Sequence, residues 1–178
     1  ALARVAQLSE QNLAVGTEVP EGAVELLPIQ QLFFARPMSQ RQHWNQSIVL
    51  EPAQRVESEP LRQALAALLA HHDALRCRFL EGVDGWHACL GATAEDNPLL
   101  WCRDFADEAQ WLELCEQAQR SLDIEQGPLL RALLGQGADG GQRLLLVIHH
   151  LVVDGVSWRI LLEDLQNTYT RLCQGPAP

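Results

Sequence analysis

The feature that most constrains the fold of this chain is an apolar run that ends in two adjacent histidines. Residues 143–148 read RLLLVI, His149 and His150 follow, and a helical pattern begins at Val156. A short, continuous apolar run is typical of a strand that is buried on both faces. Loops between a strand and a helix often carry functional side chains, so we predict a chemical site between residues 149 and 155.

The two histidines cannot have the same role. Successive side chains of a strand point to opposite faces, so only one of His149 and His150 can enter a given cavity. We expect one imidazole to be structural and the other chemical. Asp154 could hold a histidine, pair with an arginine or cap the next helix. A hydrogen-bonded core histidine next to a capping aspartate would explain the same residues without any chemistry.

Strand and helix patterns interleave along the whole chain, which predicts an α/β fold with a mixed sheet packed with helices. The length of 178 residues fits one domain. Residues 1–24 are interpreted as a linker that approaches the domain, and residues 25–178 as the domain itself. The expected strands are 44–51, 75–79, 86–90, 99–103, 129–134 and 143–149, and the expected helices are 29–35, 58–72, 104–122 and 156–173.

Composition excludes several classes of function. The formal charge of −10 disfavours binding to nucleic acid. All 13 basic residues are arginine, so no lysine of this chain can form a Schiff base with pyridoxal phosphate. The five cysteines are scattered without a CxxC pair, which argues against a disulfide framework or a zinc knuckle. Neither a membrane-length apolar run nor a signal-peptide pattern is visible, so we expect a soluble, cytoplasmic protein without a membrane partner.

Four sequence motifs carry a resemblance to a known family. Residues 149–155, HHLVVDG, match the HHxxxDG signature of the condensation-domain superfamily of nonribosomal peptide synthetases. The continuation VSWRILLEDL is more similar to the epimerisation branch. Residues 28–34, PIQQLFF, residues 43–47, HWNQS, and residues 71–76, HHDALR, resemble further epimerisation motifs in the same order. The resemblance implies the N-terminal half of an epimerisation domain, with a chloramphenicol-acetyltransferase-like fold.

The resemblance also assigns roles around the HHxxxDG signature. His150 would be the catalytic residue, and His149 a buried structural imidazole. Asp154 would form a buried ion pair with Arg76 and hold the histidine loop in place. Gly155 would allow a tight passage of the backbone, although it could equally be an ordinary turn glycine.

Other residues are candidates for shaping the substrate tunnel. Trp158 is expected in the core, one turn from the site, where it could also form part of the cavity wall. Gln30 and His72 belong to the matched motifs, and His72 also ends a stripe of helical leucines. Asn45 and Ser47 share one face of the strand at 44–51, and that face could line a cleft or lie in solvent.

The implied reaction is inversion of the α-carbon of an aminoacyl or peptidyl thioester. The substrate would be carried on the 4'-phosphopantetheine of a carrier protein, and the chain itself would bind no cofactor and no metal. A second acid or base would come from the C-terminal half of the domain, whose motifs are absent here. The expected partners are therefore the carrier protein, the C-terminal half and the adjacent synthetase domains, and the isolated chain is expected to be inactive.

Three alternatives remain open at the level of sequence. A condensation domain would use the same histidine to form a peptide bond. A non-catalytic half domain would only dock a carrier protein. A metal site could also be assembled from the five donor residues His71, His72, His149, His150 and Asp154, since two histidines and a carboxylate are a common ligand set.

Overall fold

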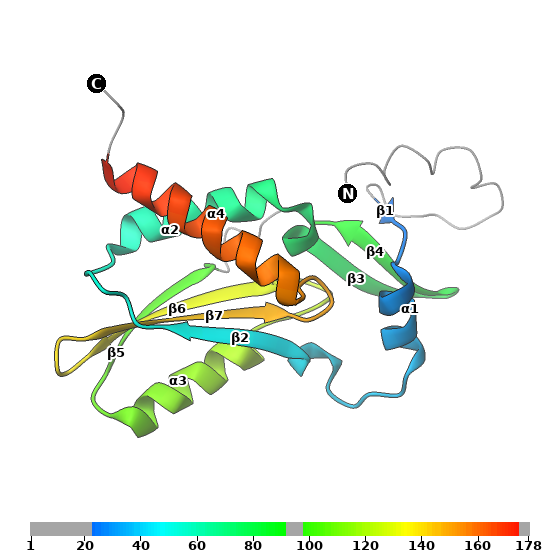
Figure 1. Ribbon diagram of the computed structural model, residues 1–178. Coiled ribbons are helices and arrows are strands. Elements are labelled where there is room, and N and C mark those ends of the chain that lie inside the picture. The colour runs from blue at the N-terminus through cyan, green and yellow to red at the C-terminus, as the bar shows by residue number, and fades with distance from the viewer. Residues whose placement is uncertain (1–22, 92–97, 175–178) are drawn as a thin grey trace.

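The structure is a computed structural model that describes residues 23–91 and 98–174. Residues 1–22, and with them nearly all of the expected linker, lie outside this range. Figure 1 shows helices on both sides of a central sheet. The elements are β1 Ala23–Val24, α1 Pro28–Ala35, η2 Arg41–His43, β2 Asn45–Leu50, α2 Ser58–His71, η3 Asp73–Arg76, β3 Cys77–Gly82, β4 Gly85–Leu90, β5 Leu100–Phe105, α3 Glu108–Arg120, β6 Leu130–Gly137, β7 Gln142–His149 and α4 Gly155–Gln174.

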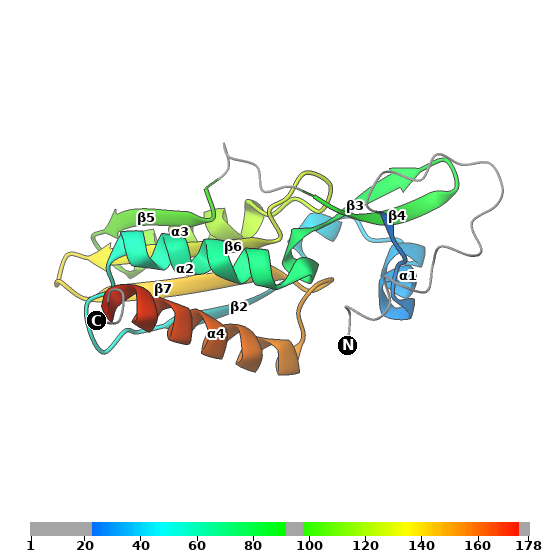
Figure 2. The ribbon, with the colours of Figure 1, turned by 90° about the horizontal axis from the view of Figure 1, so that it is seen from above.

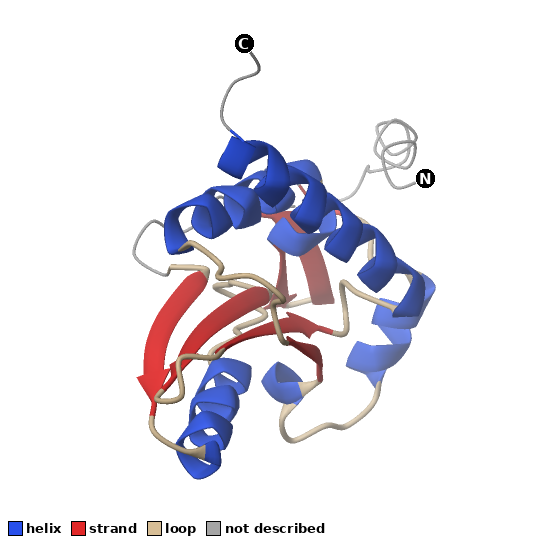
Figure 3. Ribbon diagram, turned by 60° about the vertical axis from the view of Figure 1, so that its left-hand side comes forward, coloured by secondary structure: helices blue, strands red, loops and turns tan. Residues whose placement is uncertain are grey.

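The main sheet has four strands in the order β2-β7-β6-β5. The β5–β6 pair is parallel and the other two pairs are antiparallel, so the predicted mixed α/β sheet is confirmed. Helices α2 and α4 cover one face and α3 covers the other, and Figure 3 shows these three layers. Strand β7 is therefore central in the sheet and covered on both faces.

The apolar run of β7 follows from this position. Leu144, Leu146 and Ile148 belong to the core cluster beneath α2 and α4. Leu145 and Val147 belong to the cluster beneath α3. Because alternate side chains enter different cores, both sets must be apolar, and the sequence reads as a continuous hydrophobic run. The prediction of a strand buried on both faces is confirmed.

Helix α4 is held to the sheet by one stripe of side chains. Trp158, Leu161 and Leu165 are buried at the three- and four-residue spacing of a helix face. Helix α2 contributes a matching stripe that includes Leu61, Leu65 and further leucines. The expected core position of Trp158 is thus confirmed, and the packing fixes where α4 begins relative to the end of β7.

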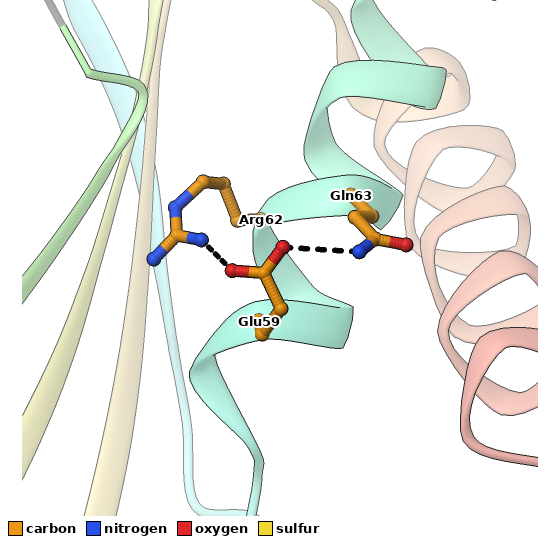
Figure 4. Close-up of polar contacts among 3 residues, drawn as sticks. All are labelled: Glu59, Arg62 and Gln63. Carbon is orange, nitrogen blue, oxygen red and sulfur yellow. Dashed lines mark hydrogen bonds and ion pairs between the residues drawn. The ribbon is translucent and has the colours of Figure 1, made fainter.

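The solvent-facing side of α2 is polar. Glu59 pairs with Arg62, and its other oxygen accepts a hydrogen bond from Gln63 Nε2 at 3.0 Å (Figure 4). Pairs at these spacings on an exposed helix contribute only about 0.2–0.5 kcal/mol each. The buried leucines of α2, rather than these contacts, therefore hold it to the protein.

A second, smaller sheet lies beside the main one. It has the strand order β1-β4-β3, and Figure 2 shows it next to α1 at one end of the molecule. Its core includes Phe34, Phe79 and Ile124, and Phe34 stacks on Trp86 with ring centroids 4.3 Å apart. This packing brings the PIQQLFF segment of α1 close to the end of β7, because Phe33 lies edge-on to the ring of His149 at 6.0 Å.

Among the described residues, none of the helices combines the length and the apolar character needed to cross a lipid bilayer.

Candidate active site

The turn after β7 is fixed by backbone hydrogen bonds to both neighbouring strands. The N–H of His149 donates to the carbonyl of Leu129, just before β6, at 3.0 Å. The N–H of His150 donates to the carbonyl of Trp44, just before β2, at 2.8 Å. The two imidazoles therefore leave a backbone that is anchored on both sides, as a positioned side chain requires.

His149 is a structural imidazole. It is fully buried, its Nε2–H donates to the carbonyl of Arg41 at 2.7 Å, and its Nδ1 accepts from the N–H of Leu151 at 3.2 Å. Burial lowers the pKa of His149, and the hydrogen bond to the Arg41 carbonyl opposes that shift. With both ring nitrogens used inside the protein, His149 has no atom left for a substrate or a metal.

His150 is exposed and has one ring nitrogen that the fold does not use for support. Its Nδ1 lies 2.8 Å from the carbonyl of Val153, and because a carbonyl only accepts, Nδ1 carries the proton. In the neutral ring Nε2 is then the acceptor. The turn thus presents a basic nitrogen at the surface of the chain.

Gln46 of β2 occupies the lone pair of that nitrogen. Its Nε2 lies 3.2 Å from His150 Nε2, and its Oε1 accepts a hydrogen bond from Trp158 Nε1 at 2.8 Å. Indole N–H can only donate, so the orientation of the Gln46 amide is determined: its oxygen faces Trp158 and its N–H faces His150. This hydrogen bond links Trp158 to His150 through Gln46, and the expectation that Trp158 forms part of a cavity wall stays a prediction.

Sequence analysis did not single out Gln46, and it left open whether the face of β2 that carries Asn45 and Ser47 lines a cleft or lies in solvent. Asn45 Nδ2 donates to the carbonyl of Gln119 at 2.9 Å, near the end of α3, and Ser47 is exposed. The structure therefore brings neither Asn45 nor Ser47 to His150. The usable signal was alternation: Gln46 shares its face with Ile48 and Leu50, which pack in the core beneath α4.

The expected ion pair between Asp154 and Arg76 is wrong. Arg76 pairs instead with Asp73, three residues earlier. Asp154 is exposed and caps α4: its Oδ1 accepts from the N–H of Ser157 at 2.7 Å, from the Ser157 hydroxyl at 2.7 Å and from the N–H of Val156 at 3.1 Å. These bonds hold the pKa of Asp154 below its ordinary value, with the Ser157 N–H contributing most. The Asp154 carboxylate therefore serves the N–H groups at the start of α4, which have no partner within the helix, and not Arg76.

Gly155 does not occupy a tight passage. A Cβ added there would meet no atom within 4 Å, and its φ does not lie in the left-handed region. Gly155 is the first residue of α4, directly after the turn, so the ordinary glycine is the nearer of the two interpretations.

Gln30 supports the histidine turn from behind. It is buried, its Nε2 donates to the carbonyl of Leu151 at 3.0 Å, and its Oε1 accepts from the N–H of Leu27 at 2.9 Å. Both ends of the amide are therefore used to tie the start of α1 to the residue after His150. Gln30 shapes the site through this tie and not as an exposed lining residue.

His72 lies in a different cluster, between α2 and α4. Its Nε2 lies 2.8 Å from Asp164 Oδ2, and donor atoms of His71, His72 and Asp164 all fall within 4.8 Å of one another. Within the part of the chain that the structure describes, this is the group that could hold a metal ion; the five-residue set considered from the sequence is not assembled. Because His72 and Asp164 already bond to each other, the pair joins α2 to α4.

Comparison with known proteins identifies the family. The condensation-domain profile matches residues 20–178, and the chain belongs to this family of nonribosomal peptide synthetase domains. A linear gramicidin synthase from Brevibacillus parabrevis is 43% identical over 98% of the chain, and surfactin synthase subunit 1 of Bacillus subtilis is 42% identical over 89%. The resemblance inferred from the HHxxxDG signature is thereby confirmed.

A solved structure narrows the comparison. The epimerization domain from the third module of tyrocidine synthetase B superposes with a TM-score of 0.78 at 36% identity, over 90% of this chain. The chain spans 37% of that domain and 4% of each of the two curated relatives. The described fold is therefore that of one part of a condensation-type domain.

Proposed function

We propose that this chain is the N-terminal half of an epimerisation domain, in which His150 moves the α-proton of a carrier-bound thioester. The main support for the proposal is the 2.8 Å contact between His150 Nδ1 and the Val153 carbonyl: because the carbonyl can only accept, the proton lies on Nδ1 and Nε2 is the base. A thioester acidifies the adjacent α-proton, and a positioned imidazole contributes roughly 10²- to 10⁴-fold to such a transfer.

Two observations favour epimerisation over peptide-bond formation. The chain is similar to an epimerization domain at 36% identity over nearly its full length. Trp158, which belongs to the continuation typical of the epimerisation branch, donates to the residue that contacts His150. The residue that resembles the branch is thus also part of the site.

Inversion needs partners. A proton must be returned to the opposite face of the α-carbon, so we infer that the C-terminal half of the domain supplies a second acid and closes the site. The Trp44 ring stacks beside His150 at 6.4 Å and is 50% exposed, and Val156 and Ile160 in the first turns of α4 are 66% and 44% exposed; such apolar surface suits coverage by that half. The substrate would arrive on the 4'-phosphopantetheine of a carrier protein within the synthetase.

Deuterium wash-in tests the proposal. The intact parent synthetase, loaded with an L-aminoacyl or peptidyl thioester in deuterium oxide, should exchange the α-proton, and His150→Ala should abolish this exchange. Exchange that survives His150→Ala would place the base elsewhere. Amide formation without any exchange would identify a condensation domain, and neither activity would identify a docking module.

A further inference from the structure

We propose that Gln46 is a second catalytic residue, which donates a hydrogen bond to the thioester oxygen as the α-proton leaves. This role rests on the proposed function, because it requires His150 to act as the base. It is motivated by the chain of contacts Trp158 Nε1–H to Gln46 Oε1 at 2.8 Å and Gln46 Nε2 to His150 Nε2 at 3.2 Å.

The Gln46 amide has one usable orientation. Turning the amide by half a rotation would place its N–H against the indole N–H of Trp158, two donors facing each other. It would also leave the Trp158 N–H without a partner in a side chain that is only 8% exposed. A buried, unpaired donor is costly, so Trp158 acts as a positioning residue that keeps the Gln46 N–H groups directed at His150.

Negative charge develops on the thioester oxygen during proton transfer. His150 Nε2 takes the proton from the α-carbon: the Cα–H bond breaks, an N–H bond forms, and the electron pair moves onto the thioester oxygen. That oxygen lies about 2.4 Å from the α-carbon, as bond lengths require. The Gln46 amide nitrogen is 3.2 Å from the accepting ring nitrogen, so it is adjacent to the same small region.

Substrate binding would exchange the hydrogen bond from Gln46 to His150 for one from Gln46 to the thioester oxygen. Before substrate binds, a Gln46 N–H occupies the lone pair of His150 Nε2. When the α-carbon approaches, that lone pair is needed for the proton, and the Gln46 N–H is free to donate to the oxygen beside it. No other reactant is required, because the proton and the electron pair are both accounted for. A preoriented donor of this kind costs little reorganisation, which is the basis of electrostatic stabilisation in enzyme sites.

The test uses wash-in by the intact parent synthetase with Gln46→Glu. Glutamate keeps the shape of the side chain and an acceptor for Trp158, but it replaces the N–H donor with an oxygen. With the loaded carrier protein supplied as a separate polypeptide and the synthetase's own carrier left unloaded, we expect the rate at saturating carrier to fall about 10²- to 10³-fold, as when an oxyanion donor is removed, while the KM for the carrier stays near the wild-type value. Gln46→Leu, which keeps the volume but no polar atom, should give a similar loss.

Matched variants separate catalysis from folding. Gln166→Glu makes the same chemical exchange on the exposed face of α4 and should leave the rate and the KM unchanged. Trp158→Phe removes the indole N–H and should lower the rate about 5- to 10-fold, the equivalent of one hydrogen bond. All variants are compared by their thermal unfolding midpoints, so that a misfolded protein is recognised.

The outcomes are distinct. Wild-type rates in both Gln46→Glu and Gln46→Leu, with His150→Ala inactive, would overturn the role of Gln46 and leave the proposed function standing. A loss that appears as a raised KM with an unchanged maximal rate would also overturn it, because Gln46 would then only bind the substrate. Exchange that persists in His150→Ala would contradict the proposed function itself.

Discussion

The end of β7 and the turn that follows it use adjacent imidazoles in opposite ways. At the end of the strand, His149 is buried, carries its proton on Nε2 and forms hydrogen bonds to the backbone with both ring nitrogens. In the turn, His150 is exposed, carries its proton on Nδ1 and presents Nε2. Both residues are histidine, so what distinguishes them is the number of ring nitrogens that bond to the backbone: two in His149 and one in His150.

The largest expected effect is on chemistry at the turn. His150→Asn keeps an N–H that can reach the Val153 carbonyl but has no basic nitrogen. Wash-in by the intact synthetase should fall by roughly 10²- to 10⁴-fold, while the free energy of unfolding of the 178-residue chain should be unchanged. A rate within a factor of a few of wild type would show that the two imidazoles do not differ in the way described.

The next effect is on stability at the end of the strand. His149→Ala leaves the Arg41 carbonyl and the Leu151 N–H without their partner in a buried setting. We expect a loss of about 2–4 kcal/mol in the free energy of unfolding, measured by urea denaturation. His150→Asn is the matched control. Equal stabilities for the two variants would contradict the structural role of His149.

The depressed pKa of His149 predicts a pH dependence of stability. The unfolded chain takes up a proton at this histidine below its ordinary pKa of about 6.5, whereas the native state resists protonation until lower pH. The stability is therefore fully present above pH 6.5 and is lost as the pH falls toward the native pKa, by at most about 1.4 kcal/mol per pH unit for one proton.

Urea denaturation at about pH 7.5 and pH 5.5 measures this dependence. His149→Gln retains an N–H for the Arg41 carbonyl but cannot titrate, so the loss of stability in acid should be smaller than in wild type. An identical loss in both proteins would mean that other groups cause it.

The smallest expected effects are on the thermal unfolding midpoint, from substitutions of Asp154 and Arg76, which were expected to pair and do not. Asp154→Ala removes a helix cap and should lower the unfolding midpoint by about 2–4 °C. Arg76→Ala breaks a separate contact with Asp73. Because the partners differ, the double variant should show the sum of the two shifts. A clear departure from additivity would restore a direct Asp154–Arg76 interaction.

Much of the fold could be predicted from local patterns. The apolar run of β7 and the leucine stripes of α2 and α4 are periodic signals, and periodicity is set by which faces are buried. The position of the site could also be predicted, because the apolar run of β7 ends at His149 and His150 comes directly after it. Their opposite environments follow from strand alternation and the turn.

The remaining part of the site depends on contacts between distant segments. Gln46 and Trp158 meet across 112 residues, and their hydrogen bond exists only because α4 packs over β2. Alternation places Gln46 on the same face of β2 as Ile48 and Leu50, but it does not show which side chains of α4 and of the turn Gln46 meets there. The predicted Asp154–Arg76 ion pair is absent because each side chain bonds to a residue three positions away in the chain: Asp154 to Ser157, and Arg76 to Asp73.

His150 presents Nε2 as a base and His149 does not, and ring-nitrogen NMR of the isotopically labelled chain can distinguish the two histidines. At about pH 7.5, where an ordinary histidine is neutral, the nitrogen shifts report which ring nitrogen bears the proton. We expect a proton on Nε2 of His149 and on Nδ1 of His150, with the assignments checked by His149→Gln and His150→Asn. A proton on Nε2 of His150 would contradict this expectation.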